Sequence, residues 1–263
     1  MAMTSSPGVS IFYDDLGQGE PALLFMPGWC ANRTVFQDLL SPCSRHRRIL
    51  ALDWRGHGQS GRAGGEFGEE QLLEDALSVI AASRVSQVVP VSLAHAGWIA
   101  LKLRQSLGAR IPKLVHLDWL VLEPPAAFLQ TLDAMQSRET WSQTVKQIFD
   151  LWLHGVENPN LTRFVREEMG AYGFEMWSRA AREIKAAYAK AGNPLKALLG
   201  LSPSVPVLHL YAQPQDLGYF TAQQIFAETH PWFYVEKLKA QSHFPLFEVP
   251  EEICTAIEQF VRG

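Results

Sequence analysis

The sequence predicts a doubly wound α/β fold, and three observations support this prediction. Apolar, β-rich runs bounded by turn residues recur along the 263-residue chain, and several are continuous rather than alternating. Continuous runs are typical of strands that are buried on both faces of a parallel sheet. Helical patterns separate the runs, as a doubly wound sheet requires. One long helical stretch interrupts this alternation, which indicates an insertion between two strands.

Seven runs are predicted as strands and two flanking segments as helices. The strands are residues 9–13 (VSIFY), 22–27 (ALLFMP), 48–54 (RILALDW), 87–92 (QVVPVS), 113–119 (KLVHLDW), 205–212 (VPVLHLYA) and 233–238 (FYVEKL). The helices are residues 69–82 and 251–261.

The interruption lies between about residues 122 and 200 and opens and closes with the breaker clusters EPP and AGNP. It contains amphipathic helical patterns over 141–153 and 177–192. We therefore predict a core formed by residues 1–121 and 201–263 and a helical cap formed by 122–200. Ligands of open α/β sheets bind at the carboxyl edge, which the cap would cover. The cap residues Trp141, Trp152 and Trp177 are explained equally well as core and as the wall of a pocket for a flat apolar ligand.

Composition and charge exclude several classes of function. The net charge is −4, and no basic stripe with interleaved aromatic residues indicates a nucleic-acid partner. No apolar run reaches the roughly 18 residues of a membrane span, and no secretory signal pattern is visible at the N-terminus. The three cysteines, Cys30, Cys43 and Cys254, fit neither a disulfide framework nor a C-x-x-C metal site. We expect a soluble cytoplasmic protein that binds neither nucleic acid nor membrane.

Residues 90–98, PVSLAHAGW, resemble a strand that enters a tight turn. An α/β-hydrolase carries its nucleophile at such an elbow, in the motif G-x-S-x-G. Here Ala94 takes the nucleophile position, with Leu93 before it and His95 after it. Loss of the triad serine costs a hydrolase on the order of 10⁶ in kcat. The sequence therefore argues against a serine esterase.

A second motif, MPGWC at residues 26–30, follows an early strand. Its Pro-Gly turn is typical of the loop that supplies half of an oxyanion hole in this fold. By position, the two donors would be the backbone N–H groups of Trp29 and His95.

A general base is predicted at His243, in the loop AQSHFPLFE (240–248) between the last strand and the last helix. Its orienting carboxylate has two candidates, Asp118 in HLDWL and Asp216 in YAQPQDL. Most hydrolases of this fold use the later position, whereas a carboxylate at the end of an apolar strand, as at Asp118, needs a partner. The turn DWRGHGQS (53–60) supports the fold, and its His57 is interpreted as structural.

Longer strings make a resemblance specific. The motifs MPGWC, DWRGHGQS, PVSxxHxGW, LDWL, IFDLWLHG, EEMGAYGFEMW, and HPWF followed by SHFP resemble the cofactor-independent 3-hydroxy-4(1H)-quinolone 2,4-dioxygenases. The resemblance covers nearly the whole chain, cap included, and is strongest to members acting on 2-alkyl quinolones such as the 2-heptyl quorum-sensing signal. It implies an α/β-hydrolase fold with the cap inserted after the sixth strand.

The resemblance also implies roles for individual residues. It makes His243 the base and Asp118 its partner in place of Asp216, and it puts substrate contacts at six positions. These six positions are Trp29, Leu93, Ala94, His95, Trp152 and Trp177. The family typically has His and Ser where this chain has Leu93 and Ala94, and His where it has Ala31.

The implied reaction needs only a quinolone and O₂, with no cofactor and no metal. His243 removes the proton of the 3-hydroxyl group, the anion reacts with O₂, and ring cleavage yields an N-acylanthranilate and carbon monoxide. Such a chemistry forms no acyl-enzyme and tolerates Ala94. Two alternatives remain open: a ligand-binding homologue that has lost catalysis, and a lyase of the hydroxynitrile type.

Overall fold

The structure is a computed structural model that describes all residues, 1–263. Its eight strands form one sheet in the order β1-β2-β4-β3-β5-β6-β7-β8. From β4 to β8 all neighbouring strands are parallel, and only the β1–β2 and β2–β4 pairs are antiparallel. The strands are β1 (Ala2–Ser6), β2 (Val9–Leu16), β3 (Ala22–Met26), β4 (Ile49–Leu52), β5 (Val88–Leu93), β6 (Leu114–Leu117), β7 (Val207–Tyr211) and β8 (Phe233–Lys237).

Every predicted strand is present, and the structure adds β1, which the prediction lacked. β1 alternates between partly buried and exposed residues, and it pairs only with β2 at the edge of the sheet. Such a strand has no continuous apolar run to reveal it. Because β1 precedes the five predicted strands that come before the insertion, the insertion follows the sixth strand, as the resemblance implies.

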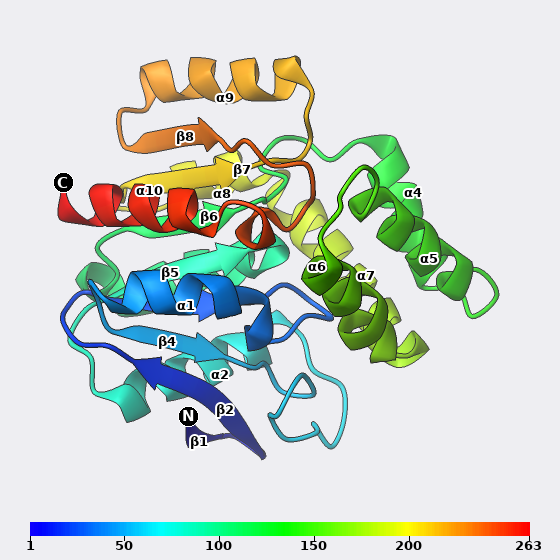
Figure 1. Ribbon diagram of the computed structural model, residues 1–263, viewed down its shortest axis with the longest axis horizontal. Coiled ribbons are helices and arrows are strands. Elements are labelled where there is room, and N and C mark those ends of the chain that lie inside the picture. Colours follow the sequence, from blue (N-terminus) through cyan, green and yellow to red (C-terminus); the bar gives the residue numbers. More distant parts are fainter.

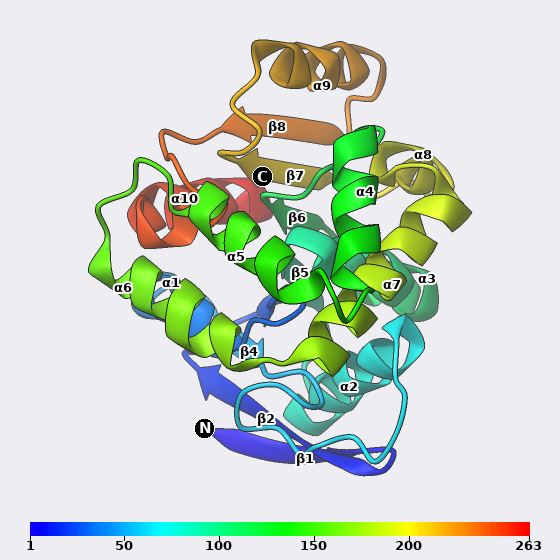
Figure 2. The same cartoon turned by 90° about the vertical axis from the view of Figure 1, so that its right-hand side faces the viewer.

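Helices cover both faces of the sheet, so the central strands β3 to β7 are buried throughout. In Figure 2, α1 (Gln37–Ser44) and α10 (Pro250–Arg262) lie on one face, with α2 (Glu69–Ser83) and α3 (Gly97–Leu107) on the other. The remaining core helix is α9 (Leu217–Thr229), which packs on β8. A single hydrophobic cluster of 74 buried residues joins these layers.

Five helices lie between β6 and β7 along the chain, within the predicted cap. They are α4 (Ala126–Met135), α5 (Trp141–Trp152), α6 (Pro159–Arg163), α7 (Phe174–Ala191) and α8 (Pro194–Leu199). In Figure 1 the arrowheads of the parallel strands point toward the side where α4 to α7 stand. The boundaries 121/122 and 200/201 stay a prediction. None of the helices combines the length and apolar composition needed to cross a membrane.

Candidate active site

The elbow predicted at residues 90–98 retains its strained backbone although it has no nucleophile. Leu93 ends β5 with an extended φ of −92°, and Ala94 follows with φ 49°. Residues with a side chain rarely adopt this left-handed region, so the surrounding structure must hold the turn in its strained conformation. A short 3₁₀ turn then leads into α3. The elbow therefore places a methyl group where a hydrolase has its attacking oxygen.

The carboxylate of Asp118 lies directly after β6, where Asp118 also adopts a positive φ of 47°. Its Oδ2 is 2.6 Å from Nδ1 of His243, which the loop after β8 supplies. Its Oδ1 accepts hydrogen bonds from the backbone N–H groups of Ala212 (2.6 Å) and Gln213 (2.9 Å). With Nδ1–H donating to the carboxylate, Nε2 of His243 keeps its lone pair. Such a pair can act as a general base.

Asp216, the other candidate partner, lies elsewhere. It is exposed and caps the N-terminus of α9, where its Oδ1 accepts a hydrogen bond from the Tyr219 N–H at 3.0 Å. The structure thus brings Asp118, and not Asp216, to His243.

The Pro27-Gly28 turn packs against the elbow. A Cβ atom added to Gly28 would lie 3.5 Å from the Leu93 carbonyl oxygen and 3.7 Å from Cβ of Ala94. The Trp54 indole N–H donates to the Pro27 carbonyl at 2.7 Å and fixes the start of the loop. The backbones of the two predicted oxyanion-hole segments are therefore neighbours.

His57 holds the other end of the same loop. Its Nε2 accepts a hydrogen bond from the Cys30 N–H at 3.1 Å, and its Nδ1 is 3.0 Å from the Arg55 carbonyl oxygen. Burial lowers the pKa of His57 to about 4, which keeps the ring neutral as this arrangement requires. Both ring nitrogens are occupied, in agreement with a structural role. The Trp29 N–H, between the two anchors, has no hydrogen-bond partner within the protein.

Aromatic rings of the cap contact one another in a row that ends at His243, and we call the rings of Trp177, Phe149 and Trp152 the aromatic wall. Trp152, the last residue of α5, stacks on the His243 ring with centroids 5.0 Å apart and planes 22° apart. Phe149 contacts both Trp152 and the buried Trp177 of α7, at 6.0 and 5.7 Å. The indole nitrogen of Trp177 is buried without a hydrogen-bond partner. Trp141 packs instead on Phe174, at 6.0 Å.

His95, directly after the elbow, lies against cap residues as well. Its ring stacks on Phe128 of α4 and meets Tyr188 of α7 edge-on, both at 5.8 Å. Burial, and secondarily the nearby His243, lower the pKa of His95 to about 3, so the ring is neutral near pH 7. Its Nδ1 is buried without a partner. Leu93 and Ala94 are also buried, so the elbow presents little polar surface apart from this ring.

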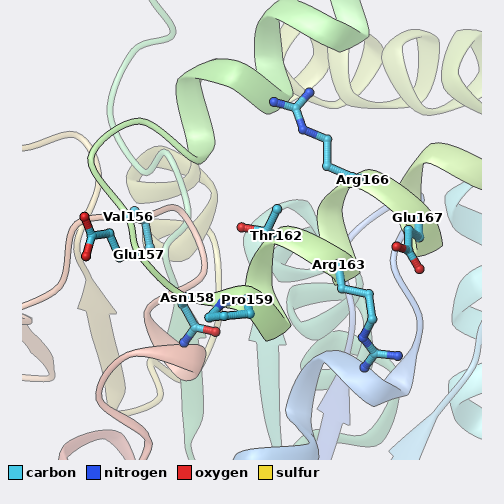
Figure 3. Close-up of a pocket in the computed structure, with 8 residues that line it drawn as sticks. All are labelled: Val156, Glu157, Asn158, Pro159, Thr162, Arg163, Arg166 and Glu167. Carbon is cyan, nitrogen blue, oxygen red and sulfur yellow. The ribbon is translucent and has the colours of Figure 1, made fainter.

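Two surface hollows lie outside this constellation. The one in Figure 3 measures about 420 Å³ and is formed by the end of the segment that joins α5 to α6, by α6 itself and by the residues directly after it. The other measures about 410 Å³ and lies between the start of α2 and α7. Neither is lined by any predicted site residue. No group of three or more His, Cys, Asp and Glu side chains is arranged to hold a metal ion.

Sequence reasoning missed the residues that support the site. Phe67 stacks on Trp29 with centroids 5.8 Å apart, and Arg179 of α7 lies 4.1 Å above the Phe67 ring. Phe67 and Arg179 are far apart in the chain, and no local pattern links them. Glu248 also contacts the His243 loop, and here a signal existed, since it ends the motif 240–248.

Sheet order, elbow and a base–carboxylate pair at the ends of β6 and β8 together define the α/β-hydrolase class. A family model described as "Alpha/beta hydrolase family" matches residues 23–256. The chain is 31% identical to the 2-heptyl-3-hydroxy-4(1H)-quinolone dioxygenase of Mycobacteroides abscessus, covering 97% of this chain and 96% of that one. It is 32% identical to the 1H-3-hydroxy-4-oxoquinoline 2,4-dioxygenase of Pseudomonas putida, covering 97% of each.

Solved structures agree with these relationships. An AqdC variant in complex with its substrate, the Pseudomonas quinolone signal, superposes with a TM-score of 0.95 at 29% identity, covering 100% of this chain and 99% of that one. The structure of 1H-3-hydroxy-4-oxoquinoline 2,4-dioxygenase gives 0.95 at 32% identity, covering 99% and 100%. The chain belongs to the α/β hydrolase family and, within it, to the 3-hydroxy-4-quinolone 2,4-dioxygenases.

Proposed function

We propose that the protein cleaves the heterocyclic ring of 2-alkyl-3-hydroxy-4(1H)-quinolones, such as the 2-heptyl quorum signal, with O₂. The products are an N-acylanthranilate and carbon monoxide, so the enzyme would quench quorum signalling. One observation carries the proposal: a His243–Asp118 pair at 2.6 Å stands beside an elbow whose residue 94 is alanine. The site has an oriented base and no nucleophile.

His243 begins the reaction by accepting the proton of the substrate 3-hydroxyl group on Nε2. Asp118 holds the tautomer that leaves Nε2 free and stabilises the imidazolium that forms. Proton removal turns the quinolone into an electron-rich anion. General-base catalysis of this kind contributes about 10² to 10⁴ in rate.

The anion then reduces O₂, and a C–O bond forms at C2. The terminal peroxide oxygen attacks C4, whose developing oxyanion is stabilised by the N–H groups of Trp29 and His95. The O–O bond and the C2–C3 and C3–C4 bonds break, and C3 leaves with its own oxygen as carbon monoxide. C2 and C4 each keep one oxygen atom of O₂, so all atoms balance without a further reductant.

The aromatic wall and the elbow suit a flat substrate with an apolar tail. We assign substrate contacts to Trp29, Trp152 and Trp177. We assign further contacts to Leu93, Ala94 and His95 at the elbow. Leu93 and Ala94 replace polar residues typical of the family and make the floor of the site more apolar, which favours a long 2-alkyl chain.

The proposal requires a quinolone and O₂ as partners and involves neither nucleic acid nor membrane. All three cysteines are free thiols, in keeping with a cytoplasmic location.

The test is incubation of the purified protein with 2-heptyl-3-hydroxy-4(1H)-quinolone, with and without air, followed by assay of carbon monoxide. We expect O₂-dependent release without added metal, and its loss in a His243→Ala variant. Binding without turnover would instead identify a ligand-binding homologue. Conversion of the substrate without O₂ would identify a lyase.

A further inference from the structure

The loop that carries His243 is held by a second carboxylate, that of Glu248. Its Oε1 accepts hydrogen bonds from the N–H (2.9 Å) and the Oγ–H (2.5 Å) of Ser242. Its Oε2 accepts one from the Gln241 N–H at 2.9 Å. The Ser242 Oγ in turn accepts from the Phe244 N–H at 3.0 Å. The backbone on both sides of His243 is thus bound, directly or through Ser242, to one carboxylate.

These hydrogen bonds hold the backbone beside His243 in place, as a helix or a sheet would hold it elsewhere in the protein. Residues 241–244 lie between the end of β8 and the 3₁₀ turn at Pro245–Phe247, outside any sheet ladder. Besides the His243–Asp118 pair, the side-chain amides of Gln213 and Gln215 also attach this segment, donating to the carbonyl oxygen and to Oε1 of Gln241. Ser242 is 1% exposed, so loss of Glu248 would leave its N–H and hydroxyl groups buried and unpaired. Unpaired buried donors are costly enough to make the loop move.

We propose that Glu248 is a positioning residue for the reaction, acting through Ser242 to set His243 against Asp118. The inference rests on the proposed function. A carboxylate suits the position because all three groups that face it are donors, and hydrogen bonds to a charged acceptor are the stronger kind. The imidazole must meet Asp118 at 2.6 Å while its Nε2 reaches the substrate. Displacement of a catalytic group by 1 Å can cost about 10²-fold in rate.

The experiment compares Glu248→Ala, Glu248→Gln and Ser242→Ala with a matched control, Glu251→Gln. Glu251 is exposed in the first turn of α10, and its carboxylate makes no hydrogen bond or ion pair within the protein. For each variant, kcat and KM with the 2-heptyl quinolone and the melting temperature are measured. The low-field proton NMR resonance of His243 Nδ1–H is recorded as well, and its assignment is checked by its loss in His243→Ala.

We expect Glu248→Ala to lower kcat by about 10- to 100-fold with KM changed less than about threefold, and to shift or broaden the low-field resonance. Glu248→Gln keeps one acceptor oxygen, so we expect its kcat to lie between those of Glu248→Ala and the wild type. Glu251→Gln is expected to have the kcat, KM and low-field resonance of the wild type. If Glu248→Ala does not fold, the intermediate loss in Glu248→Gln and a loss in Ser242→Ala carry the test.

A merely structural anchor gives a different result. The melting temperature of the Glu248 and Ser242 variants would fall, while kcat and the low-field resonance of the folded protein stayed as in the wild type. That outcome would overturn the inference. The resonance is observed without turnover, so it tests Glu248 even if the wild-type protein releases no carbon monoxide, a result that would refute the proposed function alone.

Discussion

Replacement of Asp118 by asparagine tests the roles of the base and its partner without disturbing the fold. The asparagine Oδ1 still accepts the N–H groups of Ala212 and Gln213, so the buried side chain keeps both anchors. Its NH₂ group, however, replaces the oxygen 2.6 Å from His243 Nδ1. Two N–H donors cannot face each other, so the imidazole moves its proton to Nε2 and loses the lone pair that accepts the substrate proton.

We therefore expect Asp118→Asn to lose the whole contribution of the base, about 10²- to 10⁴-fold in kcat, with KM changed only a few-fold. The assay is the initial rate of carbon monoxide release at saturating quinolone in air-equilibrated buffer. Because the two residues act as a unit, the double variant with His243→Ala is expected to be no slower than His243→Ala alone.

Asp216→Asn is the matched control, because Asp216 caps an exposed helix end and is expected to leave kcat within about twofold of the wild type. A folded Asp118→Asn variant that kept more than a third of the wild-type kcat would refute the reasoning.

Four further outcomes are expected. Ala94→Ser changes kcat/KM less than about fivefold, because no acyl-enzyme forms; a gain of 10²-fold or more, as a missing nucleophile would give, contradicts this. A 2-heptyl substrate has a higher kcat/KM than its 2-methyl analogue, since each buried methylene contributes about 0.8 kcal/mol; equal values would count against an apolar tail site. Gly97→Ala lowers the free energy of unfolding in urea by about 1–3 kcal/mol, because its Cβ would lie 2.4 Å from the buried Trp119 ring; an unchanged midpoint argues against this packing. The free energy of unfolding falls as the pH is lowered from 6.5 toward 4, because the unfolded chain binds protons that the buried histidines refuse in the folded state. His57, with a pKa of about 4, alone contributes about 3 kcal/mol, and His95, His116 and His209, whose pKa values burial also lowers, act in the same direction; urea unfolding that is flat over this range would contradict it.

The sheet and the helical cap could be predicted because their signals are local. The apolar run of β5 and the helical period over α7 both lie within a short window of sequence. β1 escaped prediction because an edge strand needs no apolar run. The elbow was found from its position after β5, and its positive φ at Ala94 confirms the strained turn.

The choice between Asp118 and Asp216 could not be made from the residues alone, because both follow a strand of the same sheet. The apolar strand before Asp118 favoured Asp118, the usual position in this fold favoured Asp216, and the resemblance decided for Asp118. In the structure the backbone N–H groups of Ala212 and Gln213 hold the Asp118 carboxylate in place. The supports of the site were out of reach for a similar reason. The stack of Arg179, Phe67 and Trp29 joins cap and core across more than a hundred residues, and no local pattern encodes such a contact.

The most direct test of the central claim, ring cleavage by direct reaction of the deprotonated quinolone with O₂, is a turnover under ¹⁸O₂ followed by mass spectrometry of both products. The account predicts an N-acylanthranilate with two ¹⁸O atoms, one in the amide carbonyl and one in the carboxylate, and unlabelled carbon monoxide in equal amount. A product with one labelled oxygen or none, or labelled carbon monoxide, would contradict it.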